Sequence, residues 1–433
     1  MVEQLIQYLS ECSVLLLGFG REGRSSYDFI RRHLPEKALG IADKNPITLE
    51  DPLVRSFTGE NYLDAMGEYE LVLKSPGIPF AGVTIPDGVT VTCQTDLFLR
   101  YADCICVGVT GTKGKTTTAT LTHAMLVQQG IPALLMGNMG LPVLDSIEDA
   151  QGKTAVLELS SHQLQFMRVS PHIAILTNLF EDHLDHYDGG FAGYADAKMN
   201  IRRWQTKDDV FFCNDAQDYS AYPAGAGRCV KISLQADDPF LDALAAENER
   251  LHGRHNATNL RFCAAAAREL GVQDAAIARA VRAFQGIEHR MEPVGTYRGI
   301  RFYNDAINTI PQGTPCVMEG IGDVDSLIFG GLDRGVDYSG FAEYLNTCMA
   351  QNLIALPETG HILAARLREM GCTKNLVPVA DMEAAVAAAY KLTAAGKACL
   401  LSPAASSYNV YRDFTQKGGH FKALVKQLGM EGV

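Results

Sequence analysis

The chain has 433 residues, of which 47% are hydrophobic and 20% charged, and its formal net charge is −12. This length predicts about three domains, no apolar run is long enough for a membrane-spanning helix, and the acidic balance argues against a general affinity for nucleic acid. The eleven cysteines show no paired C-x-x-C spacing, so we expect free thiols and neither a disulfide framework nor a zinc site.

The first part of the chain reads strand, glycine turn, helix and strand, which predicts a parallel sheet of the Rossmann type. Gly18, Gly20 and Gly23 form G-x-G-x-x-G directly after the first apolar run. Asp43 lies 20 residues beyond Gly23, at the end of the next run. Such glycines let the backbone approach a diphosphate at a helix N-terminus. Taken alone, the motif favours NAD or FAD, or else a tight turn without a ligand.

The stretch GVTGTKGKT begins a second strand, loop and helix. Gly111 and Gly114 allow a sharp turn around a phosphate. Lys115 can neutralise phosphate oxygens, and the Thr116 hydroxyl can hold Mg²⁺. The spacing differs from the usual phosphate-binding loop, because Gly108 precedes Gly114 by six positions rather than five. The order of elements still predicts ATP binding.

Polar side chains follow the next two apolar runs, where parallel strands form the working edge of a sheet. Glu158 ends the first of these runs. The second is followed by Asn178, Glu181, Asp182, His183, Asp185 and His186. These groups can complete a metal and phosphate site, although a structural, hydrogen-bonded role is the plainer interpretation of each histidine. From the residues alone, Lys198 is interpreted as a solvated helix lysine.

An alanine-rich helical pattern covers residues 236–284, and further strands that run into loops follow it. We therefore expect an α/β protein of three domains. Residues 1–93 are expected to form a Rossmann-like domain, residues 94–295 a central doubly wound sheet of the P-loop ATPase type, and residues 296–433 a Rossmann-like C-terminal domain.

Six ordered motifs resemble those of the Mur ligase family: GVTGTKGKTTT, LELSSHQL, TNLFEDHLDHY, YADAKMNI, GRHNATN and HRME. The resemblance spans all three expected domains. It implies an ATP-dependent ligase that adds D-glutamate to UDP-N-acetylmuramoyl-L-alanine through an acyl phosphate, in peptidoglycan precursor synthesis. It further implies a cytoplasmic monomer that uses ATP, two Mg²⁺ ions and a carbamylated lysine. The first glycine loop is thereby assigned to the UDP of the sugar substrate and the second to ATP.

The resemblance also implies roles for individual residues. The catalytic residues are Lys115, Lys198, His183 and Arg290. The ATP-binding residues are Gly111, Thr112, Gly114, Lys115, Thr116, Thr117, Asn256, Asn259, Arg290 and Asp305. The UDP-sugar contacts are Gly18, Gly20, Arg21, Asp43, Ser75, Gly77, Asn138 and His183. The metal ligands are Thr116, Glu158, His183 and Lys198 as its carbamate, and the amino-acid contacts are Arg334, Ser407 and Phe414.

The chain departs from the family pattern where the incoming amino acid binds. Relatives that add D-glutamate carry Asp-Ser-Lys where this chain has Asp305, Ala306 and Ile307, so a lysine that binds a substrate carboxylate is missing. Arg334 stands where a lysine is common, and its planar fork can bind a carboxylate through two hydrogen bonds. His162 replaces a frequent phenylalanine. Glutamate remains the expected substrate, but its stereochemistry does not follow.

Several alternatives remain open. A related ligase adds L-glutamate. A folylpolyglutamate-type ligase shares the ATP loop but has no need for the first glycine loop, and an NAD-dependent oxidoreductase leaves the Lys115 loop unexplained. A regulatory or scaffolding nucleotide-binding protein that has lost its amino-acid pocket is kept open by Ile307.

Overall fold

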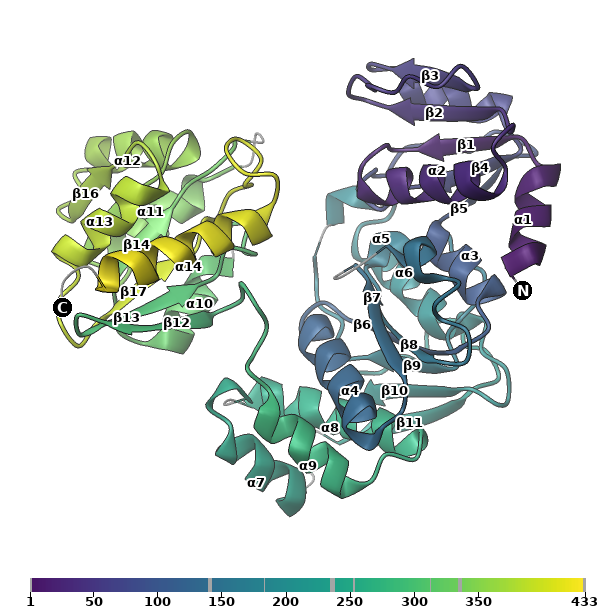
Figure 1. Cartoon of the computed structure of the whole chain (residues 1–433). Coiled ribbons are helices and arrows are strands. Elements are labelled where there is room, and N and C mark those ends of the chain that lie inside the picture. Colours follow the sequence, from purple (N-terminus) through teal and green to yellow (C-terminus); the bar gives the residue numbers. More distant parts are fainter. Residues whose placement is uncertain are drawn as a thin grey trace. The chain divides into compact units, whose positions relative to one another are not determined.

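The structure is a computed structural model that describes residues 2–138, 142–182, 184–233, 238–251, 254–311, 313–333 and 337–430. Contacts within the chain divide it into two compact units, Met1–Gln285 and Gly286–Val433 (Figure 1). The first unit contains two parallel sheets, and the second contains one mixed sheet. The expected α/β class is therefore confirmed.

The first sheet has five parallel strands in the order β3-β2-β1-β4-β5. They are β1 (Val14–Leu17), β2 (Leu39–Asp43), β3 (Val54–Thr58), β4 (Leu71–Lys74) and β5 (Thr90–Thr92). The helices of this part are α1 (Val2–Glu11), α2 (Arg21–His33), η1 (Tyr62–Glu68) and α3 (Gln94–Tyr101). This strand order is that of a Rossmann half. The order reverses between β1 and β4, so the loops after these two strands meet where such sheets bind ligands.

The second sheet has six parallel strands in the order β11-β10-β9-β6-β8-β7. They are β6 (Ile105–Thr110), β7 (Ala133–Gly137), β8 (Thr154–Glu158), β9 (Ile173–Leu176), β10 (Val210–Asn214) and β11 (Arg228–Ile232). Strands β8 and β9 are buried along their whole length, as expected for parallel strands covered on both faces. Because β6 lies between β8 and β9, the carboxyl ends of these three strands share one edge.

Helices surround the second sheet. They are α4 (Lys115–Gln129), η2 (Val143–Ser146), α5 (Ser161–Leu164), η3 (Leu184–His186), α6 (Phe191–Arg203), α7 (Pro239–Glu247), η4 (Glu249–Leu251), α8 (Arg254–Glu269) and α9 (Asp274–Ala283). The alanine-rich pattern forms α7, α8 and α9, and the last two pack against α4. Small side chains allow this close approach to the helix that follows the second glycine loop.

The second unit has six strands in the order β12-β13-β17-β14-β15-β16. They are β12 (Glu292–Tyr297), β13 (Ile300–Asn304), β14 (Val324–Phe329), β15 (Asn352–Ala355), β16 (Asn375–Pro378) and β17 (Ala398–Leu401). The helices are α10 (Gly313–Ile321), α11 (Ser339–Thr347), α12 (Thr359–Glu369), α13 (Met382–Leu392) and α14 (Phe414–Met430). All neighbouring strands are parallel except β12 and β13.

The antiparallel pair β12 and β13 was not expected from the sequence. Its connection consists of Arg298 and Gly299, with φ angles of +50° and +77°. Two consecutive residues with positive φ favour the tight hairpin turn that suits twisted strands. Arginine at the first of these positions is an uncommon choice, so the residue pattern did not signal the turn.

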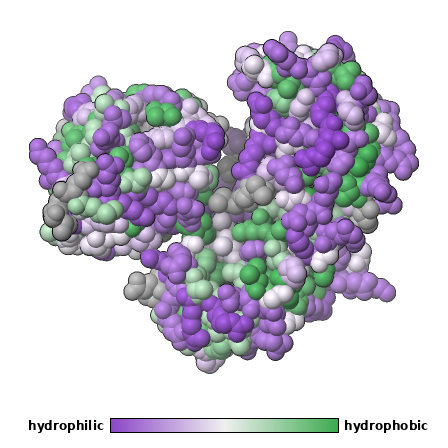
Figure 2. All heavy atoms as spheres, in the orientation of Figure 1, coloured by the Kyte–Doolittle hydropathy of each residue, from purple (hydrophilic) through white to green (hydrophobic). Residues whose placement is uncertain are grey.

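None of the described helices combines the length and apolar character that crossing a bilayer demands. The face seen in Figure 2 is mainly hydrophilic, with hydrophobic residues in small groups.

Candidate active site

The glycine loop after β1 is held by the ends of neighbouring strands. Gly18 has φ of +91°, and its carbonyl accepts a hydrogen bond from Ser75 Oγ at 3.0 Å. Asp43 Oδ2 accepts the N–H of Phe19 at 2.7 Å. A Cβ at Gly23 would lie 2.0 Å from the Gly18 oxygen, so only glycine fits there. The end of β2 and the residues after β1 and β4 therefore shape one turn.

The other residues that we expect at this loop are less tightly packed. Gly20 is the N-cap of α2, and Arg21 is its exposed first residue. A Cβ at Gly20 or at Gly77 would meet no atom within 4 Å. Packing therefore does not require glycine at either position. Asn138 belongs to the second sheet and lies directly after β7.

The second glycine loop connects β6 to α4, which confirms the expected strand, loop and helix. Gly111 and Gly114 have φ of +151° and +87°. A Cβ at Gly111 would lie 2.0 Å from Thr177 Oγ1, and one at Gly114 would lie 2.5 Å from Asn259 Oδ1. Gly108 is inside β6, where a Cβ would lie 2.5 Å from Pro171 Cγ. It is a packing glycine, so the unusual spacing does not concern the loop.

Residues after β9 and on α6 hold this loop in place. Thr177 Oγ1 donates to the Lys113 oxygen at 2.6 Å. Asn178 accepts the Lys113 N–H at 2.9 Å and donates to the Lys113 oxygen at 3.0 Å. The Thr112 hydroxyl lies 3.0 Å from the Tyr194 hydroxyl. Asn178, considered above as part of a metal and phosphate site, therefore acts as a clamp on the loop.

We expect Gly111→Ala to destabilise the first unit by about 1–3 kcal/mol, because the new methyl group meets Thr177 and the backbone has positive φ. Denaturant unfolding measures the loss. Gly130→Ala is the matched control, since Gly130 also has positive φ, +86°, but has open space for a Cβ. Equal losses in the two variants would show that the contact with Thr177 is unimportant.

Two lysine side chains end at the second loop. Lys115 Nζ donates to the oxygens of Gly111 and Thr112 at 3.1 and 3.2 Å. Lys198 Nζ, from α6, donates to the Gly111 oxygen at 2.9 Å. Lys198 is 2% exposed, so its interpretation as a solvated helix lysine is wrong. The helix presents it to the sheet, and the loop carbonyl gives its amine a partner.

The environment of Lys198 favours its neutral form. Burial, and then the positive charge of Lys115, lowers the pKa of the Lys198 amine well below its ordinary value, while Asp182 and Glu158 act in the opposite direction. Desolvation and a nearby like charge both disfavour an ammonium ion. A lysine with this surrounding is more nucleophilic near neutral pH than an exposed one.

Glu158 ends β8, and one of its carboxylate oxygens has no hydrogen-bond partner among the described residues. The side chain is 2% exposed. Its Oε1 accepts a hydrogen bond from Asn138 Nδ2 at 3.0 Å, whereas Oε2 is buried without a partner among the described residues. Buried carboxylate oxygens normally have a partner, and magnesium prefers such oxygen ligands. The site thus fits a divalent cation beside the loop.

Further residues expected to bind ATP also lie at the second loop. Thr116 and Thr117 are in the first turn of α4, with Thr116 buried. Asn256 and Asn259 lie on α8, where Asn259 Nδ2 is 3.5 Å from Asn256 Oδ1. Because Asn259 is adjacent to Gly114, α8 contributes directly to this site. His183 lies outside the described residues.

In the second unit, Asp305 directly follows β13 and is 2% exposed. Its Oδ2 accepts from Ser402 Oγ at 3.0 Å and its Oδ1 accepts the Met291 N–H at 3.3 Å. Burial raises the pKa of Asp305 to about 6, an effect that the charge of Arg290 opposes. The Arg290 side chain is exposed. These two residues therefore lie close together within this unit.

The expected contacts of the incoming amino acid belong to the same unit. Ser407 is 2% exposed, and its Oγ has no hydrogen-bond partner within the described part of the chain. Phe414 begins α14, and its ring centre is 6.0 Å from that of His289. Arg334 lies outside the described residues.

Comparisons with known proteins identify the family. Residues 109–248 match the model described as the Mur ligase middle domain. A UDP-N-acetylmuramoylalanine–D-glutamate ligase of Symbiobacterium thermophilum is 33% identical over 406 residues, which cover 87% of this chain and 88% of that protein. The chain belongs to the Mur ligase family. A ligase of the same name from Listeria monocytogenes is 30% identical, with 96% of each chain covered.

Solved Mur ligases share the fold. The MurF ligase from Thermotoga maritima in complex with ADP has a TM-score of 0.56, 16% identity and 97% coverage of both chains. The UDP-N-acetylmuramate–alanine ligase MurC from the same organism has a TM-score of 0.55 and 17% identity, with 96% of this chain and 100% of that chain covered. The expected resemblance, the three-domain fold and the ligase class of enzyme are thus confirmed.

Sequence reasoning missed Tyr194 in this Mur ligase. Besides its contact with Thr112, the Tyr194 ring centre lies 4.9 Å from Lys198 Nζ. Tyr194 therefore helps to orient the amine of Lys198. Its position four residues before Lys198 places both on one helix face, and that spacing was a usable signal.

The exchange at His162 has a structural explanation. His162 Nε2 lies 2.9 Å from His186 Nδ1, and its ring packs against Tyr187 with centres 5.4 Å apart. The imidazole thus packs on the Tyr187 ring and makes a polar contact with His186.

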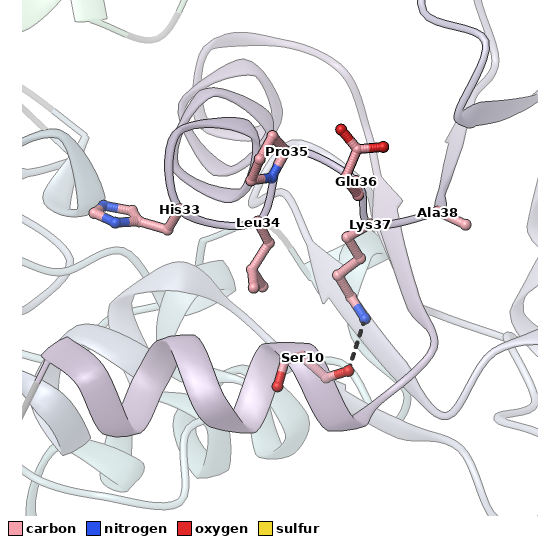
Figure 3. Close-up of a pocket in the computed structure, with 7 residues that line it drawn as sticks. All are labelled: Ser10, His33, Leu34, Pro35, Glu36, Lys37 and Ala38. Atoms are coloured by element: carbon pink, nitrogen blue, oxygen red, sulfur yellow. Dashed lines mark hydrogen bonds between the residues drawn. The ribbon is translucent and has the colours of Figure 1, made fainter.

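A pocket in the first sheet lies away from both glycine loops. Its volume is about 450 Å³, and Figure 3 shows Ser10 and residues 33–38 around it. Residues 34–38 precede β2, so the pocket is at the amino ends of the strands. Ligands of such sheets bind at the carboxyl ends. The pocket is therefore separate from the candidate active site.

Proposed function

We propose that this Mur ligase joins D-glutamate to UDP-N-acetylmuramoyl-L-alanine at the expense of ATP, as a step of peptidoglycan precursor synthesis. The observation that carries the proposal is the second glycine loop, where Lys115, Lys198 and Glu158 converge. The first loop, at the switch point of a separate sheet, supplies the second nucleotide site that a UDP-linked substrate requires.

The reaction makes an amide from a carboxylate. The terminal carboxylate of the UDP-sugar substrate attacks the γ-phosphorus of ATP, ADP leaves, and an acyl phosphate forms. The amine of D-glutamate then adds to the acyl carbon and displaces phosphate. Lys115 would hold the transferred phosphoryl group, and the N–H groups at the start of α4 would bind the β-phosphate. Positioning and fixed positive charge thus supply most of the catalysis.

Magnesium fits the oxygen ligands around the second loop. Thr116 and Glu158 would hold one ion, and His183 with the carbamate of Lys198 would hold a second. The unpaired Glu158 Oε2 supports the first assignment. When bound, magnesium supplies positive charge to the phosphoryl oxygens.

Lys198 is proposed to carry a carbamate. Its neutral amine would attack CO₂, forming an N–C bond and releasing one proton. The lowered pKa supports this step, because a larger fraction of the amine is neutral at pH 7 than in an exposed lysine. Since the ammonium form predominates below the pKa, carbamate formation decreases as the pH falls.

The remaining assignments are carried over from the family. Asn138 would contact the sugar substrate, and Asn256 and Asn259 would line the adenine side. Arg290 and Asp305 would contact ATP. Arg334, Ser407 and Phe414 would bind glutamate.

The proposed organisation follows the same resemblance. Residues 1–93 would bind the UDP-sugar, 94–295 ATP and 296–433 the amino acid. Because both nucleotide substrates are made and kept inside the cell, we propose a cytoplasmic location, and we propose a monomer.

Phosphate release from ATP tests the function. The full-length enzyme is incubated with UDP-N-acetylmuramoyl-L-alanine and D-glutamate, L-glutamate or no amino acid. Sustained release that needs D-glutamate is expected. A requirement for L-glutamate would favour the related ligase. If no phosphate is released with either enantiomer, a non-catalytic nucleotide-binding relative is favoured.

Asp43→Ala is expected to raise the KM for the UDP-sugar by about tenfold while the KM for ATP stays within twofold, because the carboxylate orders the first loop through the Phe19 N–H. Steady-state kinetics measure both constants. Asp28→Ala, which removes an exposed carboxylate from α2, is the matched control. An unchanged KM for the UDP-sugar in Asp43→Ala would remove this loop from substrate binding.

A further inference from the structure

Lys417 is a buried ammonium group near the start of α14. Its side chain is 2% exposed, and its Nζ donates to the Gly330 oxygen at 2.8 Å. No carboxylate pairs with it among the residues that the structure describes. Burying a charge is costly unless an opposite charge or several hydrogen bonds compensate. Burial lowers the pKa of this amine to about 8, as expected for a cation without a counter-ion.

The position of Lys417 on its helix increases this cost. It is the fourth residue of α14, which begins at Phe414. The N-terminal end of a helix carries partial positive charge, so cations are unfavourable there and anions are favourable. The helix does not stabilise a lysine in this position. An anion bound at the helix start would stabilise it.

A second polar group at this place also lacks a partner. Ser407 Oγ is buried without a hydrogen bond in the described structure. Its neighbour Ser406 accepts the Leu332 N–H at 2.8 Å. A Cβ on Gly331 would lie 2.2 Å from the Ser406 oxygen and 3.3 Å from Lys417 Nζ. The segments after β14 and β17 therefore pack closely against each other beside the lysine amine, and only glycine at position 331 allows this approach.

This cluster lies at the sheet edge that Asp305 also occupies. Strand β17 is between β13 and β14, and Asp305, Ser407 and Gly330 follow these strands at their carboxyl ends. The loop after β13 brings Ile307, whose apolar side chain cannot bind an anion. A buried cation and an unpaired hydroxyl thus stand at one edge of this sheet.

We propose that Lys417 binds a carboxylate of the incoming glutamate, with Ser407 Oγ donating a second hydrogen bond. Lys417 thereby supplies the positive charge that position 307 lacks. The flexible stem of lysine lets the amine exchange the Gly330 oxygen for the ligand. The inference rests on the proposed ligase function and adds a residue that the family resemblance did not assign.

Lys417→Met in the full-length enzyme tests the proposal. The KM for D-glutamate is expected to rise about 10- to 100-fold, as for the loss of a hydrogen-bonded ion pair. The KM values for ATP and the UDP-sugar are expected to stay within twofold. Lys426→Met, which removes an exposed lysine from the same helix, is the matched control. A D-glutamate KM that changes no more than in this control overturns the proposal.

A second variant and a wild-type control accompany Lys417→Met. If Lys417→Met does not fold, as judged by circular dichroism, Lys417→Gln, which keeps a neutral donor for the Gly330 oxygen, replaces it. Its D-glutamate KM is expected to rise severalfold, and an unchanged value overturns the proposal. Wild-type enzyme that releases no phosphate with either glutamate enantiomer contradicts the ligase function itself, which separates that failure from a failure of Lys417.

Two analogues identify which carboxylate is bound. D-Glutamine lacks the side-chain carboxylate, and 4-aminobutyrate lacks the α-carboxylate. Each is measured as a competitive inhibitor against D-glutamate in wild type and Lys417→Met. The analogue that retains the bound carboxylate is expected to lose affinity in the variant, and the other to be unaffected. Equal effects on both analogues, or none on either, overturn the proposal.

Discussion

Lys115→Ala is expected to abolish measurable turnover, with a loss in kcat of at least about 10³-fold. Lys115 is the first residue of α4, and its amine rests on the oxygens of Gly111 and Thr112. From there it can move to the transferred phosphoryl group. Its removal takes positive charge from the point where negative charge develops. Phosphate release with saturating substrates measures the loss.

The matched control for this variant is Lys113→Ala. Lys113 belongs to the same loop, and its side chain is exposed, so the substitution removes the same charge from the same segment. We expect it to lose far less activity. Near-normal turnover of Lys115→Ala would show that ATP chemistry does not take place at this loop.

Lys198→Ala is expected to be inactive and to be partly rescued by acetate. The carbamate would be an acidic oxygen ligand, and alanine leaves a buried space beside Gly111 that a small carboxylate can enter. Activity is measured with increasing acetate at constant ionic strength. Rescue by at least about tenfold over the unrescued variant, with chloride ineffective, is the expected result.

Lys198→Arg provides the control for charge. Arginine keeps a positive charge but does not become neutral in proteins, so it cannot react with CO₂, and its longer side chain fills the space. We expect no activity and no rescue. Full activity of Lys198→Ala without acetate would remove the carbamate from the mechanism.

Local patterns predicted the elements of the site. Gly18, Gly23 and Asp43 were recognised from apolar runs and the turn after the first of them. In the structure, Gly23 in α2 and Asp43 at the end of β2 both contact the loop that contains Gly18. Glu158 was recognised as the end of a strand, and it ends β8. These predictions succeeded because each depends on residues that are close in the sequence, where strand propensity and turn geometry act.

The burial of individual side chains was not predictable from local sequence patterns. Lys198 belongs to a helix whose residue pattern is compatible with an exposed lysine. It is buried because the helix packs against a sheet whose loop carbonyl, at Gly111, is 87 residues away. Lys417 is buried through contacts with Gly330, also 87 residues distant. The spacing of Gly108 was equally uninformative until its contact with Pro171 was known.

Residue order, together with the conformations that glycine permits, was enough to predict the α/β class, the two glycine loops and the family. The packed structure was needed to show which lysines are buried, and which carboxylate oxygen and which hydroxyl have no hydrogen-bond partner among the described residues. Burial and hydrogen bonding depend on the packing of segments distant in the sequence, and charge and pKa follow from that packing. The reactive character of Lys198 and the ligand-binding role proposed for Lys417 are therefore properties of the fold.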